Sequence, residues 1–194
     1  LAIATDLKDL RQRIAKIVVA YNKKGGEVTT ADLEVDGAMT AWMVDTLNPS
    51  LMQTIEGWPV FVHAGPFANI AHGCNSVIAT KAAMRLSDIV VTEAGFGADL
   101  GAEKFFDIKC RKAGIAPHLA VVVATVRALK YHGGASQKTL EEENLEALES
   151  GFANLERHLE NIGKFKIPAI VVINAFASDS EAETQKVIDL CGRI

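Results

Sequence analysis

Four short, largely apolar segments constrain the fold of this chain most strongly, and helix-like stretches separate them. The segments cover residues 60–62, 88–92, 119–124 and 169–173. Apolar runs of this kind are typical of strands buried on both faces, as in parallel sheets. Alternation with helices predicts an α/β fold with a mostly parallel sheet flanked by helices on both faces. No linker or composition shift divides residues 1–194, so we expect a single α/β domain.

The predicted helices have clear end signals. The first is capped by Thr5 or Asp6 and keeps its apolar spacing through Val18. The second begins near Thr30 and ends before Asn48-Pro49. The other predicted helices cover residues 74–86, 102–112, 140–161 and 181–191.

The composition excludes several classes of protein. The chain has 194 residues, of which 49% are hydrophobic and 23% charged, and its net charge of −4 comes without a basic stripe. This argues against a nucleic-acid surface, and the apolar runs are too short to span a membrane. The three cysteines lack zinc-ligand spacing and indicate reduced thiols in the cytoplasm.

Ligands of such sheets bind beyond the carboxyl ends of the strands, which draws attention first to the loop at 63–76. It contains His63, Asn69 and His72 among several glycines. Two histidines and an amide in one strand-end loop favour a functional site. The alternative is a tight turn with structural histidines.

The next loop, at 92–104, carries an aromatic residue between two glycines. Gly95, Phe96 and Gly97 lie between Glu93 and Asp99. The glycine spacing only approximates a dinucleotide fingerprint, which alone is a weak signal. Phe96 is suited to stacking on a flat heterocycle, although it could instead fold back onto the sheet.

The last two loops follow the strands at 119–124 and 169–173. Arg127 and Lys130 place cations at the ligand edge, where they could hold a carboxylate or phosphate or remain solvated or ion-paired. Asn174 and Phe176 follow the last strand, and Phe176 could pair with Phe96 around a planar ring or fill the core. The chain lacks a G-x-x-x-x-G-K-[ST] phosphate-binding loop.

These loops resemble the formate–tetrahydrofolate ligase family. The run Val-Ala-Thr-Val-Arg-Ala-Leu-Lys-Tyr-His-Gly-Gly at 123–134 matches a family signature, and residues 61–81 and 91–109 read like the family almost throughout. The resemblance covers the whole chain. It implies a P-loop NTPase-like domain and ligation of formate to N10 of tetrahydrofolate through formyl phosphate. It also implies ATP with Mg²⁺, a monovalent cation such as K⁺ or NH4⁺, no tightly bound cofactor, and a cytoplasmic homo-oligomer.

The resemblance also suggests roles for the loop residues. Phe96 and Phe176 match aromatics that stack around the pterin or the adenine, although Ala177 stands where many members have proline. By chemistry, His63 or His72 would assist proton movement, and Arg127 or Lys130 would hold formyl phosphate or the folate glutamate tail. We further assign substrate binding to Asn69, Glu93 and Asp99. Cofactor binding is assigned to Gly95, Gly97 and Asn174, and the metal ligands are unknown.

Family members are more than twice as long as this chain and bind ATP through a Gly-rich loop near their N-terminus. We therefore expect an internal segment of a longer ligase, inactive by itself, with the ATP-binding region before Leu1. Two alternatives remain: a catalytically incomplete binding or assembly domain, and a transferase that binds anions without ATP.

Overall fold

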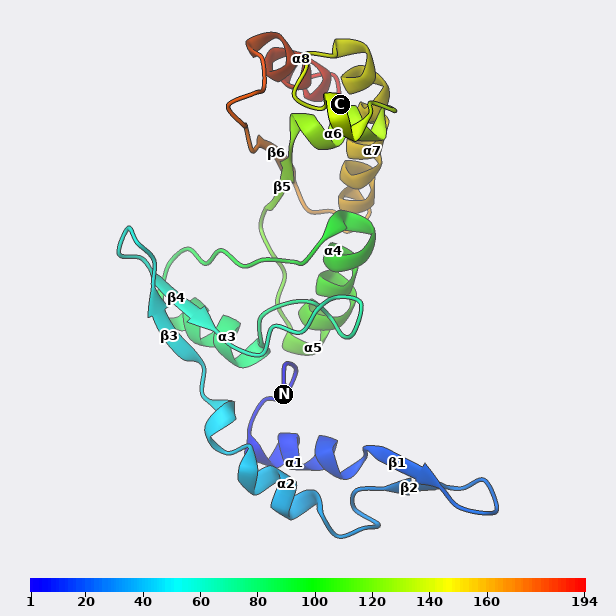
Figure 1. Cartoon of the computed structure of the whole chain (residues 1–194). Coiled ribbons are helices and arrows are strands. Elements are labelled where there is room, and N and C mark those ends of the chain that lie inside the picture. The colour runs from blue at the N-terminus through cyan, green and yellow to red at the C-terminus, as the bar shows by residue number, and fades with distance from the viewer. The chain divides into compact units, whose positions relative to one another are not determined.

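The computed structural model describes residues 1–194, which form two compact units (Figure 1). Unit 1 consists of Leu1–Phe96 and Glu103–Ile115, and unit 2 of Gly97–Ala102 and Ala116–Ile194. No helix combines the length and the apolar content that crossing a membrane requires.

Unit 1 is built from helices and two antiparallel hairpins. Its hairpins pair β1 (Val18–Tyr21) with β2 (Glu27–Thr29) and β3 (Ser50–Gln53) with β4 (Pro59–Val62). Its helices are α1 (Leu7–Ala15), α2 (Asp36–Trp42), the 3-10 turn η1 (Asp45–Leu47), α3 (Val77–Leu86), the π-helical turn η3 (Phe105–Cys110) and α5 (Arg111–Ala113). The short helix α4 (Ala102–Lys104) joins the units in sequence. Leu10 and Ile14 of α1 form a small core with Ala4.

Several predicted elements of unit 1 were wrong. The first helix ends at Ala15, because Val18 enters a hairpin with Thr29. The helix expected from Thr30 begins only at Asp36. Residues 88–92 form no strand, and Ile89 and Val91 are 83% and 91% exposed. A parallel strand needs a hydrogen-bonded neighbour, and this segment has none here.

Unit 2 contains the parallel pair that the sequence predicts. β5 (Ala120–Ala124) pairs with β6 (Ala169–Ile173) in parallel, from Ala120 opposite Ala169 to Ala124 opposite Ile173. Around it lie the π-helical turn η2 (Gly97–Gly101), α6 (Val126–His132), the 3-10 turn η4 (Gln137–Thr139), α7 (Leu145–Gly163) and α8 (Glu181–Cys191).

The helices cover one face of this parallel pair. Val122, Ala124, Val171 and Ile173 pack into a core with residues from α6, α7 and α8. The alternate residues Val121, Val123, Ile170 and Val172 remain exposed. The expected sheet covered on both faces is therefore realised only in part, as a two-stranded parallel sheet with one covered face. The likeness to P-loop NTPases and the single domain stay predictions.

Helices α6 and α7 approach so closely that two glycines are required. A Cβ atom on Gly133 would lie 1.7 Å from the Ala147 carbonyl oxygen, and one on Gly151 would lie 1.9 Å from the Leu129 carbonyl oxygen. This close contact fixes the position of α6 and therefore also that of Thr125, which connects the end of β5 to the start of α6.

Candidate functional site

His63 follows β4 and anchors the loop at 63–76. Its Nε2 lies 2.6 Å from the Thr46 carbonyl oxygen, and its Nδ1 lies 2.6 Å from the Ser76 hydroxyl. A carbonyl can only accept, so Nε2 carries the ring proton. Ser76 accepts from the Ala79 N–H as the cap of α3 and can donate to Nδ1. Both ring nitrogens of this buried histidine are thus engaged within the protein.

His72 is buried but keeps one ring nitrogen without a partner. Its Nδ1 accepts from the Cys74 N–H at 3.1 Å, so the neutral ring carries its proton on Nε2, which makes no hydrogen bond of normal geometry although the Ala2 backbone lies near the ring. Burial lowers its pKa, and the positive charge of Lys109 lowers it further. The residue lines a cavity of about 720 Å³ together with Pro66, Lys104 and Ile108. His72 therefore offers a neutral hydrogen-bond donor.

Lys109, which the sequence reading missed, is fully buried beside this histidine loop. Its ammonium has no hydrogen-bond partner and lies 5.3 Å from the centroid of the Phe105 ring. Burial lowers its pKa, as expected for an amine removed from water. Burial also raises the pKa of the Cys74 thiol to about 11, which makes Cys74 a poor nucleophile at neutral pH.

The other unit 1 candidates point into solvent. Asn69, Glu93 and Gly95 are exposed, and Phe96 is 85% exposed. The positive φ of Gly95, 79°, lies in the region that glycine adopts without strain. Phe96 does not fold back onto the core, which was the alternative that the sequence left open.

Gly97 and Asp99 belong to unit 2, in η2. Gly97 has a φ of 70°, and a Cβ atom there would lie 2.5 Å from an Asp99 carboxylate oxygen. The other Asp99 contact is long, since the His158 Nδ1 lies 3.9 Å from its Oδ1. Asp99 is largely exposed.

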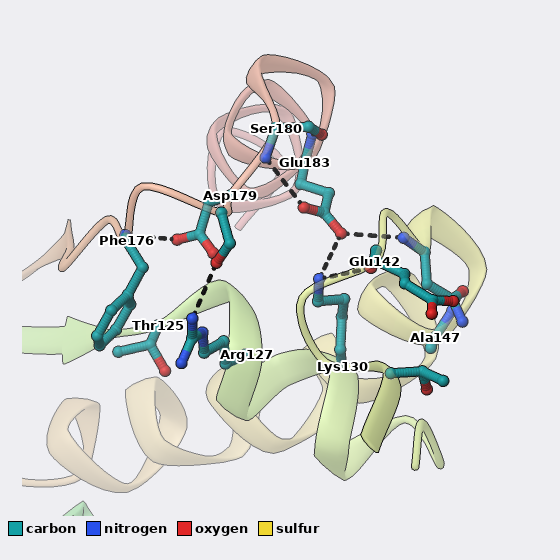
Figure 2. A network of polar contacts seen from close by, with 12 residues as sticks. Thr125, Arg127, Lys130, Glu142, Ala147, Phe176, Asp179, Ser180 and Glu183 are labelled. Atoms are coloured by element: carbon teal, nitrogen blue, oxygen red, sulfur yellow. Dashed lines mark hydrogen bonds and ion pairs between the residues drawn. The ribbon is translucent and has the colours of Figure 1, made fainter. Parts of the chain in front are cut away.

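At the carboxyl edge of the parallel pair, Arg127 and Phe176 come together (Figure 2). Thr125 caps α6 through the Ala128 N–H, which places Arg127 in the first turn beyond β5. The guanidinium carbon of Arg127 lies 4.6 Å from the Phe176 ring centroid, within cation–π range. Its Nη2 donates to Glu141 and to the Ser178 hydroxyl, each at 3.0 Å. Phe176 is 42% exposed.

Asp179 closes the loop that carries Phe176. Its Oδ2 accepts from the Phe176 N–H at 2.8 Å, and the Asp179 N–H donates to the Phe176 carbonyl. Two buried polar atoms of this cluster have no partner, namely Asp179 Oδ1 and Arg127 Nε. At the start of the same loop, the Asn174 N–H donates to the Ala124 carbonyl and continues the parallel ladder by one step.

Lys130, by contrast, is committed to a buried ion pair. Its ammonium lies 2.8 Å from Glu183 Oε1 and donates to the Glu142 carbonyl, and both paired side chains are 0% exposed (Figure 2). Burial by itself raises the pKa of Glu183, but the hydrogen bonds from Lys130, Asn144 and Ser180 outweigh it and lower the pKa. The pair joins α6 to the start of α8.

The structure thus brings together some of the predicted site residues. Arg127 and Phe176 form one cluster, whereas Lys130 turns away from it into the core of unit 2. Phe96 lies in unit 1 and Phe176 in unit 2, so their convergence on one hollow stays a prediction. Glu183 escaped the sequence reading, although Ser180-x-x-Glu183 is a capping box that the structure confirms.

Comparison with known sequences decides the family. A sequence model of formate–tetrahydrofolate ligase matches residues 1–194. The chain belongs to the formate–tetrahydrofolate ligase family. This confirms the resemblance that the loop motifs carry.

Two relatives in the family show what share of a full-length ligase this chain covers. The chain is 56% identical over 192 residues to a formate–tetrahydrofolate ligase of Granulibacter bethesdensis, and covers 34% of it. It is 58% identical over 194 residues to one of Zymomonas mobilis, and covers 35% of it. The chain spans about a third of the length of the curated relatives it matches.

No group of three or more metal-ligating side chains gathers in residues 1–194. The three cysteines are free. The Mg²⁺ and monovalent cation that the family resemblance implies therefore find no ready-made cage among these side chains, and both stay predictions.

Proposed function

We propose that this chain is the folate-facing part of a formate–tetrahydrofolate ligase. In the reaction that the family implies, a formate oxygen attacks the γ-phosphorus of ATP, giving formyl phosphate and ADP. N10 of tetrahydrofolate then attacks the formyl carbon, phosphate leaves, and N10 loses its proton. We place the second step at the loops beyond β5 and β6.

The observation that carries this proposal is the exposed ring of Phe176 in a chain that matches the family throughout. The ring stands just past the carboxyl end of β6, the edge at which open α/β sheets bind ligands. An aromatic ring that stays 42% exposed although Arg127 lies over it is suited to stacking on a pterin. Phe96, still more exposed, is the second candidate for such stacking.

Among the two histidines, the geometry favours His72 for a role at the reaction. Its Nε2–H makes no hydrogen bond of normal geometry with the protein, although the Ala2 backbone lies near the ring, and its lowered pKa keeps the ring neutral near pH 7. It would donate a hydrogen bond to a substrate oxygen. Both ring nitrogens of His63 are used by Thr46 and Ser76, so we assign His63 to holding the loop.

We further propose that binding of ATP, Mg²⁺ and the monovalent cation requires parts of the ligase outside these 194 residues, since the chain has no P-loop motif. Phosphoryl transfer needs positioned cations around the phosphates. Cytoplasmic location and homo-oligomeric assembly belong to the same proposal.

The test compares the isolated chain with a full-length ligase that contains it. With ATP, formate and tetrahydrofolate, only the full-length protein should form 10-formyltetrahydrofolate; turnover by the isolated chain would show that the P-loop is dispensable. Supplying formyl phosphate directly tests the second step on its own, because that step consumes no ATP. Formyl transfer from formyl phosphate by the isolated chain would support placing this step here. A full-length protein that transfers the formyl group from formyl phosphate but forms no product from ATP and formate would favour an ATP-independent transferase. Binding of folate and formyl phosphate by the full-length protein but not by the isolated chain would favour an assembly domain.

A further inference from the structure

Arg127 stands where a substrate-binding cation is expected, but its contacts are with the protein. Both N–H bonds of its Nη2 are directed at Glu141 and Ser178, and its Nε is buried. Its guanidinium carbon is 4.6 Å from the Phe176 ring centroid. The Arg127 side chain is 33% exposed, so the contact with Phe176 is partly removed from water.

The loop around Phe176 is held from two sides. Asp179 accepts the Phe176 N–H at 2.8 Å and fixes the backbone, while Arg127 lies over the ring and limits its rotation. Ser178 lies between Phe176 and Asp179 in sequence, and its hydroxyl accepts a hydrogen bond from Arg127 at 3.0 Å. The ring, its backbone and its cationic neighbour therefore form one unit of hydrogen bonds and packing.

We propose that Arg127 is a positioning residue for Phe176. Its guanidinium occupies one face of the ring, so that a flat heterocycle stacks on the other face, and it acts on the ligand through the ring. This inference rests on the proposed folate-facing function. A cation on one face also withdraws electron density from the ring, which favours electron-rich partners such as a reduced pterin.

The experiment uses full-length ligase and measures kcat and the KM for each substrate. Arg127→Met should raise the KM for tetrahydrofolate about fivefold, which is about 1 kcal/mol, with kcat and the KM values for ATP and formate nearly unchanged. Phe176→Ala should raise the same KM. The double variant should be no worse than Phe176→Ala alone, because Arg127 acts through that ring.

Milder variants keep the test sound if Arg127→Met folds poorly. Arg127→Lys keeps the charge but loses the planar fork, and Ser178→Ala removes one hydrogen bond to it; both should raise the KM for tetrahydrofolate by less. Arg157→Met is the matched control, because Arg157 is an exposed arginine on α7 paired only with its neighbour Glu160. Thermal unfolding checks the fold of each.

The outcomes separate the two proposals. If Phe176→Ala leaves the KM for tetrahydrofolate unchanged, the folate-facing function fails. If Phe176→Ala raises it and Arg127→Met does not, the function stands and the positioning role is overturned. Additive losses in the double variant, or a raised KM for ATP or formate in Arg127→Met, would show direct contact with substrate and also overturn it.

Discussion

Breaking the buried pair of Lys130 and Glu183 should unfold unit 2 selectively. In Lys130→Met the carboxylate stays buried and keeps only the N–H groups of Asn144 and Ser180. In Glu183→Gln the buried ammonium loses its counter-charge. Removing one partner of a buried pair costs about 3–5 kcal/mol. The double variant Lys130→Met/Glu183→Met replaces both charges by apolar groups and should cost much less than the two single changes together.

Urea unfolding followed by circular dichroism measures these losses, and hydrogen exchange of peptides from α6 and α8 locates them. Unit 1 should keep its protection, because Lys130 and Glu183 both belong to unit 2. Single-variant losses below about 1 kcal/mol would put the pair in the range of surface ion pairs and refute the reasoning. Equal losses in both units would refute the selectivity.

Three further predictions concern stability. Lys109→Met removes a buried ammonium without a hydrogen-bond partner, so the free energy of unfolding measured with urea should rise by about 1–3 kcal/mol. A fall in this free energy would reveal a hidden partner. The lowered pKa of Glu183 stabilises the fold at pH values above 4.5, the pKa of this carboxyl in the unfolded chain, and this contribution is lost as the pH falls through the folded pKa. Melting temperatures measured from neutral to acidic pH should therefore fall more in the wild type than in Lys130→Met/Glu183→Met. Gly133→Ala, which forces a Cβ against the Ala147 carbonyl, should cost at least about 3 kcal/mol by thermal unfolding, against about 1 kcal/mol for Gly114→Ala, where φ is 66° and the space is open.

Local signals predicted the parallel pair and the helices α7 and α8, but they missed α6, because residues 126–132 were interpreted as a strand-end loop. The apolar, β-branched runs at β5 and β6 favour strands, and the helix starts at Ser76, Thr125 and Ser180 carry side chains that satisfy free N–H groups. Period and capping are properties of a few adjacent residues, so the sequence suffices to predict them.

Pairing partners and side-chain commitments could not be predicted in this way. Val18 continues the apolar spacing of α1 but pairs with Thr29 across a turn, and the segment at 88–92 has strand character without a neighbouring strand. Lys130 looked like a ligand-facing cation because its partner Glu183 lies far along the chain. Arg127 and Phe176 were each proposed for the site, but only three-dimensional structure places the guanidinium over the ring.

The most direct test of the folate-facing proposal is calorimetric titration of full-length ligase with tetrahydrofolate, for wild type, Phe96→Ala and Phe176→Ala. We predict saturable binding by the wild type and a loss of binding free energy in each variant. That loss should include about 0.5–1.5 kcal/mol from ring stacking, in addition to the loss of buried apolar area. Affinities equal to that of the wild type in both variants would contradict the proposal that these exposed rings receive the folate.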